Sequence, residues 1–222
     1  MAQASDDLLQ NKTCLITGAT SGIGYVTALE IARHGATVAL VGRDRGRAQD
    51  AVTRICQETG NSGVDFLLAD LSSQEQVRQL ANDFTQRYPN LHILINDAGA
   101  VFWSPQETVD GLEMTFALNH LAPFLLTNLL LPTLRASAPV GRSTPFMNAV
   151  FTLIRPFAIS PEKGAATAIY LATSPDVATT SGLYFVKQKP ARSSPASYNQ
   201  ESARRLWTVS EQLTGVRSTS HE

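Results

Sequence analysis

The sequence predicts an α/β fold in which helices cover both faces of a doubly wound parallel sheet. Short apolar runs alternate with segments of helical periodicity through the first 135 residues, and a glycine-rich turn directly follows the first run. The run at 91–96 is apolar apart from His92 and Asn96, as a strand covered on both faces is. Strands and helices in this alternation form crossovers that place parallel strands in one sheet.

The elements of this first half follow from their boundary residues. Residues 13–17 form the first strand, and the helix after the glycine turn ends near His34, because Gly35 accepts the left-handed conformation that often ends a helix. A capping box of Ser72 and Glu75 begins another helix, which ends near residues 88–89. The remaining elements are strands at 36–41, 64–70 and 91–96 and a helix at 44–59.

The rest of the chain is mostly helical and contains one clear strand. A long helix spans roughly residues 111–135, with an irregularity at Pro123, and a loop rich in small residues and proline covers 136–145. Residues 146–159 are apolar but poorly periodic. After them come a helix at 162–173, a short strand at 183–187 and a helix at 200–213 before Gly215. We expect one domain, residues 1–222.

Composition and charge predict a neutral globular protein. Lys and Arg number 18 against 19 Asp and Glu, so nothing indicates a nucleic acid partner. The two cysteines have no metal-binding spacing, and residues 1–12 contain no apolar signal segment, so we expect a cytoplasmic protein. The longest apolar stretch, 121–134, is interrupted by Pro123, Asn128 and Pro132 and falls short of the roughly 20 residues of a membrane span.

The segment from Thr17 to Gly24 lies between a predicted strand and a predicted helix. Glycine is needed where the backbone turns sharply and where it approaches a pyrophosphate too closely for a Cβ atom. The unpaired N–H groups and the positive end of the helix that begins near Gly22 then face the phosphates. Glycines are common in any turn, but this position in the strand–helix unit predicts a dinucleotide site.

The second strand ends without the acidic residue that would bind a ribose 2′-hydroxyl and favour NAD. Gly42 takes this place, about twenty positions beyond the turn, and Arg43 follows it. A guanidinium group pairs well with the 2′-phosphate of NADP(H). We therefore assign the phosphate to Arg43 and expect Arg45 and Arg47 to lie on the solvated face of the next helix.

Polar residues also end the third and fourth strands. Asp70 closes the third, and the segment 96–99, Asn-Asp-Ala-Gly, closes the fourth. Ligands of open α/β sheets bind at the carboxyl edge of the strands. Either group alone would suit an ordinary turn, but their joint position favours a ligand-binding role.

Four motifs in order now resemble those of the short-chain dehydrogenase/reductase family: residues 17–24, Asp70, residues 96–99 and Asn119. The similarity covers residue 12 to about 135 and resumes in 146–213, where the chain looks like the retinol-dehydrogenase-like branch. The resemblance implies a Rossmann fold whose dinucleotide-binding half is 12–135.

The resemblance also implies roles for individual residues. Asn119 matches the catalytic asparagine, which in the family bends the helix and holds a water of the proton relay. Family members usually have asparagine where this chain has Asp97. The implied cofactor-binding residues, together with Arg43, are Gly18, Ser21, Gly22, Ile23 and Gly24 at the pyrophosphate, Asp70 and Leu71 at the adenine, and Asn96, Ala98 and Gly99 at the ribose.

The family's chemistry needs a tyrosine as proton donor and a lysine four residues later, which lowers the tyrosine pKa from about 10. None of the five tyrosines has that lysine: the residues four positions on are Leu29, His92, Ser174, Gln188 and Ser202. Tyr184 and Lys187 are three apart in a predicted strand, where odd separations point to opposite faces. The pair is absent.

The resemblance implies that an internal deletion near residues 138–145 removed the fifth strand with its serine, the Tyr-x-x-x-Lys helix and the sixth strand. Residues 136–145 become a junction loop and 146–222 a C-terminal remnant, which leaves an incomplete sheet of about five strands. The strand 183–187 would pair with the 91–96 edge or leave both edges open. The helix near 112–135 would expose an apolar stripe that a homo-oligomer or aggregate hides, namely Leu118, Leu121, Phe124, Leu125, Leu129 and Leu130.

Different functions follow from these observations. The resemblance implies an NADP(H)-dependent oxidoreductase of a small-molecule carbonyl or alcohol with a lipophilic body, impaired because it lacks its proton donor. Acid–base catalysis typically contributes about 10²–10⁴-fold, so a trace rate remains conceivable. The alternatives are a non-catalytic NADP(H)-binding protein and an interaction protein derived from the family.

Overall fold

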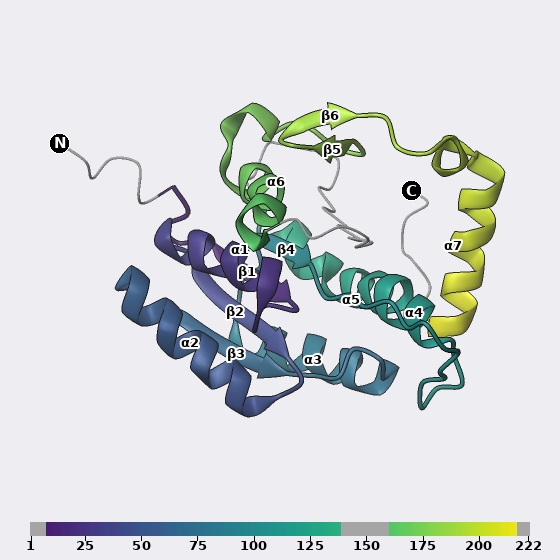
Figure 1. Cartoon of the computed structure of the whole chain (residues 1–222), viewed down its shortest axis with the longest axis horizontal. Helices are drawn as coiled ribbons and strands as arrows, with labels where there is room; N and C mark the ends of the chain where they lie inside the picture. The colour runs from purple at the N-terminus through teal and green to yellow at the C-terminus, as the bar shows by residue number, and fades with distance from the viewer. Residues whose placement is uncertain (1–7, 139–159, 217–222) are drawn as a thin grey trace.

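The computed structural model describes residues 8–138 and 160–216, which are built around a parallel sheet (Figure 1). The sheet contains β1 (Thr13–Thr17), β2 (Thr37–Gly42), β3 (Val64–Leu68) and β4 (Ile93–Asn96), in the order β3-β2-β1-β4. β1 pairs in parallel with β2 on one side and β4 on the other, so that the strand order reverses beside β1. This reversal is the point at which open sheets of this kind bind ligands.

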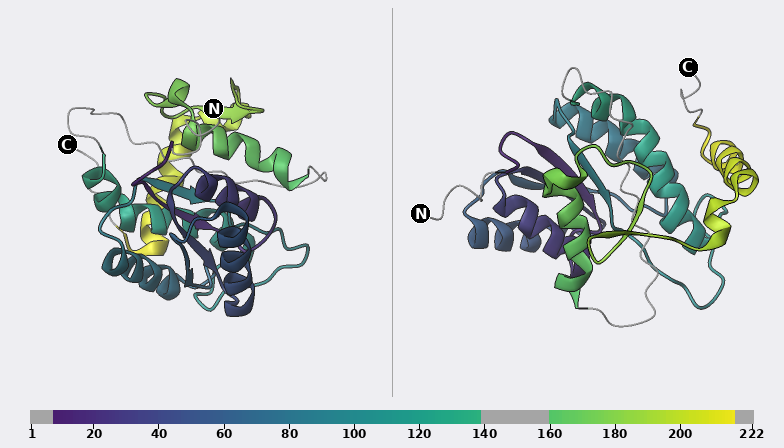
Figure 2. Two further views of the ribbon diagram at one scale, coloured as in Figure 1. Left: turned by 90° about the vertical axis from the view of Figure 1, so that its left-hand side faces the viewer. Right: turned by 90° about the horizontal axis from the view of Figure 1, so that it is seen from above.

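Helices cover both faces of the sheet, as the sequence predicts (Figures 1 and 2). One face packs against α1 (Gly22–Arg33) and α2 (Arg45–Thr59), with a core that includes Ile31 and Ile55. The other packs against α3 (Gln74–Arg87) and the long helix, with a core that includes Phe84, Leu125 and Leu130. Because both faces are buried, the strands themselves need no polar side.

The N-terminus of α3 differs by one residue from the expected capping box. Ser73 is the N-cap, and its hydroxyl accepts a hydrogen bond from the backbone N–H of Gln76. Ser72 instead donates its hydroxyl to Asp70 at 2.7 Å. Asp70 therefore draws Ser72 towards the end of β3, and the helix begins one residue later.

The long helix contains a π-helical turn. It consists of α4 (Met114–Phe116), the π-helix η1 (Ala117–Leu121) and α5 (Ala122–Ala136), and η1 carries the irregularity expected at Pro123. Pro123 lies inside this continuous helix, directly after the π-helical turn, and it has no N–H to donate to the regular hydrogen-bond ladder. Length and a mean hydropathy of 1.4 alone would allow Met114–Ala136 to cross a membrane, but residues of α5 contribute to the buried core.

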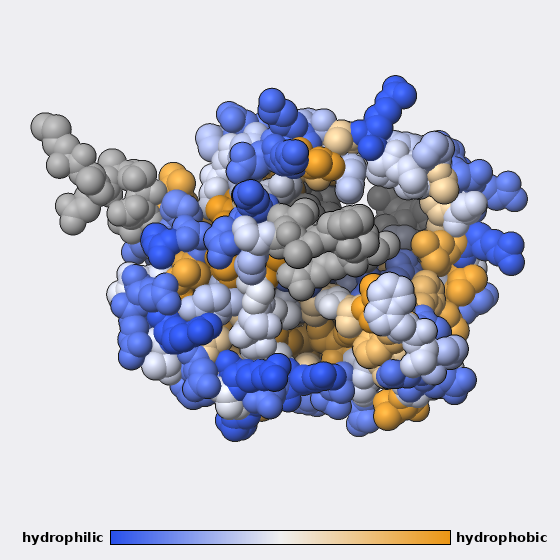
Figure 3. All heavy atoms as spheres, viewed as in Figure 1, coloured by the Kyte–Doolittle hydropathy of each residue, from blue (hydrophilic) through white to orange (hydrophobic). Residues whose placement is uncertain are grey.

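The expected exposure of the apolar stripe on this helix is wrong for half of its residues. Leu121, Leu125 and Leu130 are buried, because their side of the helix faces the sheet and α3. The outer side is partly covered by α7 (Gln200–Thr214), whose Trp207 packs edge-on against Phe124 with ring centroids 5.0 Å apart. Figure 3 shows hydrophobic side chains gathered around α7.

The strand that the sequence predicts at 183–187 does not join the parallel sheet. β5 (Tyr184–Val186) forms an antiparallel hairpin with β6 (Lys189–Ala191), through a two-residue turn in which Lys187 and Gln188 have φ values of 49° and 65°. Positive φ at both positions is the signature of a type I′ turn, which suits the twist of a hairpin. The outer edge of β4 therefore pairs with no strand among residues 8–138 and 160–216.

The remaining C-terminal elements pack around this framework. α6 (Pro161–Thr173) lies against α1 at Gly164, where a Cβ atom would come within 2.5 Å of Ile23 Cδ1. The 3-10 turns η2 (Pro175–Val177) and η3 (Pro195–Tyr198) flank the hairpin. The predictions for the loop after residue 138 and for the apolar segment 146–159 lie outside the described residues.

Candidate nucleotide-binding site

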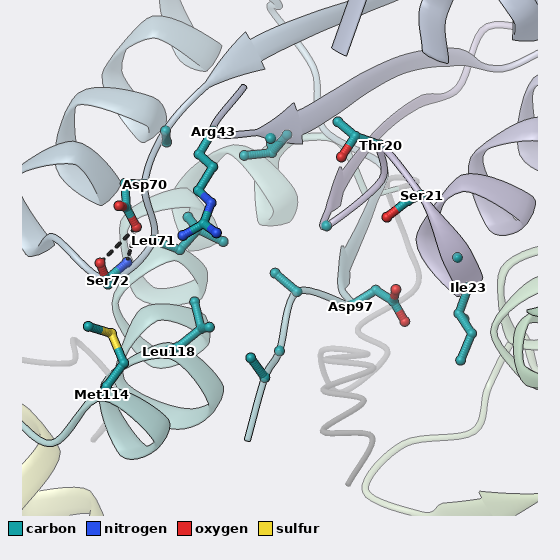
Figure 4. A pocket seen from close by; sticks show the side chains of 18 of the residues that line it. Thr20, Ser21, Ile23, Arg43, Asp70, Leu71, Ser72, Asp97, Met114 and Leu118 are labelled. Carbon is teal, nitrogen blue, oxygen red and sulfur yellow. Dashed lines mark hydrogen bonds between the residues drawn. The ribbon is translucent and has the colours of Figure 1, made fainter. Parts of the chain in front are cut away.

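A pocket of about 680 Å³ opens at the carboxyl ends of all four strands of the sheet. Its size is in the range that holds small molecules and cofactors. The glycine turn after β1, the ends of β2 and β3, the segment after β4 and the start of the long helix all line it (Figure 4). The strand-end residues that the sequence singled out are therefore largely brought together.

The glycine turn is shaped by two close approaches. Gly18 has a φ of 68°, and a Cβ atom there would lie 2.8 Å from Ala98 Cα, so the turn presses on the segment after β4. Gly22 has a φ of 61° and begins α1, but a Cβ atom there would meet nothing within 4 Å. The start of α1 thus offers unpaired N–H groups next to open space, as an anion site requires.

The end of β2 explains why no acidic residue occupies position 42. A Cβ atom on Gly42 would lie 2.5 Å from Thr20 Cγ2, so any side chain there would have to displace Thr20. Arg43 follows and lines the pocket. Arg45 instead lies over the ring of Phe66, at 5.7 Å from its centroid, and neither it nor Arg47 is among the lining residues.

The end of β3 supplies hydrogen-bonding groups opposite an apolar wall. Asp70 Oδ1 accepts hydrogen bonds from the backbone N–H and the hydroxyl of Ser72, which fixes the orientation of the carboxylate. Leu71 lies beside it, and Met114 and Leu118 face this corner from the long helix (Figure 4). A flat aromatic base with hydrogen-bonding edges would suit these surroundings.

Asp97 places a carboxylate on the opposite side, close to the glycine turn. A Cβ atom on Gly24 would lie 2.9 Å from Asp97 Oδ2 and 2.5 Å from the carbonyl oxygen of Gly18. Gly24 is therefore a packing residue between the start of α1 and this carboxylate. Ala98 and Gly99, which follow Asp97, line the pocket as expected, and the N–H of Ala98 donates to Thr17 Oγ1 at 3.1 Å.

Asn96 and Asn119 lie behind the pocket and are not among its lining residues. Asn96 is buried and donates to Thr127 Oγ1 at 3.2 Å, which ties the end of β4 to α5. Asn119, on the π-helical turn, accepts from the N–H of Ala100 at 2.9 Å and donates to its carbonyl oxygen at 2.8 Å. Both asparagines position the segment 97–100 in this structure, and neither faces the open space.

Several lining residues were not singled out from the sequence. Met114 and Leu118 are four residues apart and share one helix face. This spacing, on a helix that begins near the carboxyl edge of the sheet, could have indicated both as lining residues. Phe102 and Gln106 lie in an irregular segment, and no pattern in the sequence indicates them. The other lining residues that the sequence did not indicate are Val41, Ala69, Ser72 and Ala100, whereas Thr20 and Asp97 lie in the segments 17–24 and 96–99 that it singled out.

Comparisons with known proteins agree with this geometry. The sequence profile of the short-chain dehydrogenases matches residues 12–142. Mouse retinol dehydrogenase 14 is 33% identical over 293 aligned positions, which cover 94% of this chain and 87% of the mouse protein. Human polyprenol dehydrogenase is 29% identical over 283 positions, covering 93% and 86%.

Solved structures show the same similarity over part of the chain. A short-chain dehydrogenase of Escherichia coli CFT073 has a TM-score of 0.51 at 33% identity, over 59% of each chain. A second structure, complexed with NADPH, has a TM-score of 0.50 at 33% identity, over 58% of this chain and 55% of the other. The chain thus superposes on less than two thirds of these proteins.

The fold and the pocket define a Rossmann-type dinucleotide-binding protein, with a parallel sheet that is incomplete relative to its neighbours. This chain belongs to the short-chain dehydrogenase/reductase family, and within it to the retinol-dehydrogenase-like branch.

Proposed function

We propose that the chain binds NADP(H) in this pocket and is impaired as an oxidoreductase. The position of Arg43 supports the cofactor most directly: it lines the pocket beside Gly42, and none of the described ion pairs involves it. A guanidinium group that is not neutralised by a protein carboxylate is available for a phosphate. The absence of an acid at position 42 removes the repulsion that would exclude a 2′-phosphate.

The pocket residues fit the adenosine and diphosphate parts of this cofactor. Asp70 and Leu71 border the space for adenine, with Leu118 as an apolar contact on the other side. The N–H groups at Ser21 and Gly22 face the diphosphate, since they begin α1 and its positive end. Bound NADP(H) would supply or accept a hydride; the residues of this chain would hold and orient it.

The impairment rests on the missing acid–base pair. No tyrosine in the sequence is followed by lysine at the fourth position, and no tyrosine or lysine is among the described lining residues. The alignment with the mouse relative also runs over 293 positions although this chain has only 222 residues. At least 71 positions of that alignment therefore have no counterpart here, as an internal deletion requires.

Any residual substrate would be a lipophilic alcohol or its carbonyl product. The relatives named above are a retinol and a polyprenol dehydrogenase, and retinol and polyprenols are both lipophilic alcohols. We expect the chain to bind the cofactor without catalysing hydride transfer at a normal rate. The residues proposed to bind the cofactor are present, whereas the tyrosine that would donate the proton is not.

The test is a cofactor titration with the full chain, followed by a turnover assay. NADPH should bind more tightly than NADH, and NADPH should not be consumed above background with retinal or other aldehydes. Equal affinities for NADPH and NADH would contradict the assignment of Arg43. Protein-dependent consumption that is lost in Tyr170→Phe or Tyr184→Phe would reveal a replacement acid, and no binding of either cofactor would favour an interaction protein.

A further inference from the structure

A buried side chain of α7 holds the outer side of the long helix, beside which α7 runs (Figures 1 and 2). Ser210 of α7 is fully buried, and its hydroxyl oxygen lies 2.8 Å from Nε2 of His120. Because the Ser210 hydroxyl donates its own hydrogen to the carbonyl oxygen of Leu206, at 2.7 Å, Nε2 of His120 is the donor of the bond between them. Ser210 therefore fixes the direction of the His120 ring.

Two further contacts attach α7 independently of this bond. Trp207 packs edge-on against Phe124 of the long helix, with ring centroids 5.0 Å apart. At the C-terminus of α7, Arg78 of α3 donates to the carbonyl oxygen of Thr214, a position at which the helix dipole favours a cation. Loss of the single bond to His120 would therefore leave α7 in place.

His120 lies in the π-helical turn η1, directly after Asn119. In η1 the backbone N–H of Ala122 donates to the carbonyl oxygen of Ala117, five residues earlier. Such turns are rare and occur mostly singly inside α-helices, so specific contacts are needed to maintain one. Adjacent residues of a helix point in different directions, and here His120 contacts α7 while Asn119 contacts the segment that follows β4. The turn is thus held from two sides.

The contacts of Asn119 reach a wall of the pocket, the segment 97–100. The Asn119 carboxamide accepts the N–H of Ala100 at 2.9 Å and donates to its carbonyl oxygen at 2.8 Å. A Cβ atom on Gly99 would lie 3.0 Å from Asn119 Oδ1, so the carboxamide packs directly on this backbone. Ala98 in turn presses on the glycine turn, where a Cβ atom on Gly18 would lie 2.8 Å from its Cα. A displacement of Asn119 would therefore move the wall and the turn that it supports.

We propose that Ser210 is a positioning residue for the cofactor. By accepting the hydrogen bond of His120, it holds the π-helical turn in the arrangement in which Asn119 binds Ala100 and places the segment 97–100 for the cofactor. This inference rests on the proposed NADP(H) site and adds to it a dependence on the C-terminal helix. Because coupling between two sites is reciprocal, the bound cofactor also stabilises the docked position of α7.

The first experiment measures the affinity of Ser210→Ala for NADPH by calorimetry with the full chain. Alanine is a better helix former than serine, so α7 should keep its structure. Without the bond, the turn and the wall adopt other arrangements for part of the time, and the apparent Kd rises as the binding-competent fraction falls. The worth of one neutral hydrogen bond limits this effect, so the affinity should fall about three- to tenfold.

Two controls separate this bond from the general condition of α7. Ser202→Ala makes the same substitution at an exposed position of the same helix. Trp207→Ala weakens the packing of α7 on Phe124 and leaves the bond between Ser210 and His120 intact. Well below the melting temperature, both variants should bind NADPH within about twofold of the unaltered chain.

A second experiment follows the wall without any cofactor. NMR-detected hydrogen exchange of the Ala100 amide reports the bond that it donates to Asn119. This amide should exchange at least about threefold faster in Ser210→Ala than in the unaltered chain, because the contact is open for a larger fraction of the time. Its exchange should stay unchanged in Ser202→Ala.

The outcomes separate this inference from the proposed function. An affinity of Ser210→Ala within about twofold of the unaltered chain, or unchanged exchange at Ala100, overturns the inference while the NADP(H) site stands. Equal weakening by Trp207→Ala also overturns it, because docking of α7 as a whole would then position the wall. If the unaltered chain binds no NADPH, the proposed function fails with the cofactor part of the inference, and exchange at Ala100 still decides whether Ser210 holds the segment 97–100.

Discussion

The carboxylate of Asp97 stands where the family resemblance leads us to expect an asparagine. It lies against the glycine turn, where the diphosphate of a bound cofactor would approach it. Two like charges about 6 Å apart in water repel by roughly 0.7 kcal/mol, which is about threefold in affinity. We therefore predict that Asp97→Asn, which keeps the shape of the side chain, binds NADPH about threefold more tightly in calorimetry at low salt.

The gain should shrink as salt is added, because screening weakens a charge–charge repulsion. Asp50→Asn removes a charge from the exposed face of α2, outside the pocket, and should leave the affinity for NADPH unchanged. Weaker binding by Asp97→Asn would mean that the carboxylate organises the turn, and that its positioning role outweighs its charge.

At the same scale, the sequence predicts which residues surround the pocket better than it predicts what each one does. Gly18, Gly22, Arg43 and Asp70 line the pocket because strand ends and turns have fixed places in a parallel sheet. Gly24, like Asn96 and Asn119, packs behind the pocket instead. A motif predicts the path of the backbone. Whether a side chain faces the ligand or a neighbouring element depends on packing, which the spacing of residues in the sequence does not show.

At the scale of elements, α7 covers part of the outer face of the long helix. The resemblance implies that the helix lost in the deletion would otherwise pack there. Trp207 is 44% exposed and packs on Phe124, whereas Trp103, in the irregular segment before α4, is 96% exposed. We predict that Trp207→Ala lowers the free energy of unfolding by about 1.5–2.5 kcal/mol, roughly half the cost for a buried tryptophan. Thermal melting and urea unfolding measure it.

Trp103→Ala is the matched control, because it removes the same side chain from a site with almost no contacts, and its melting temperature should stay unchanged. Equal melting of both tryptophan variants would show that α7 contributes little to stability.

His120 gives the interface between the long helix and α7 a second contact, since its Nε2 lies 2.8 Å from Ser210 Oγ. Burial lowers the pKa of the His120 imidazole. Ser210 donates its own hydroxyl to the carbonyl oxygen of Leu206, so the neutral His120 donates to Ser210.

The sequence predicts the elements of the first half closely. In the C-terminal half it predicts the strand at 183–187 but not the strand with which it pairs. Alternating buried strands and amphipathic helices predict parallel pairing, and the observed order β3-β2-β1-β4 is one of the few arrangements that such crossovers allow. The strand at 184–186 is also present, but its partner Lys189–Ala191 is short, exposed and contains Pro190. Such a segment has no strand signature, and only the geometry of the 187–188 turn creates the hairpin.

At the scale of the whole molecule, the outer edge of β4 is the surface from which we predict self-association. Alternate N–H and C=O groups of an edge strand point away from its neighbour, and they are satisfied by water or by another chain. β4 is apolar from Ile93 to Ile95, with Leu94 and Ile95 buried, and the part of the chain that the structure describes places no strand beside its outer edge. An apolar edge without charges or a bulge lacks the usual protection against pairing.

We therefore predict that the protein self-associates through this edge. Size-exclusion chromatography with light scattering should show a species larger than the monomer whose share rises with protein concentration, and melting should occur at a low temperature relative to an intact family member. Hydrogen exchange locates the contact, because the outward amides of Ile93–Asn96 should exchange more slowly at high concentration. If protection rises instead on the outer face of α5, the helix is the interface; a monomer at all concentrations with high melting temperature would mean that the chain itself has closed the edge.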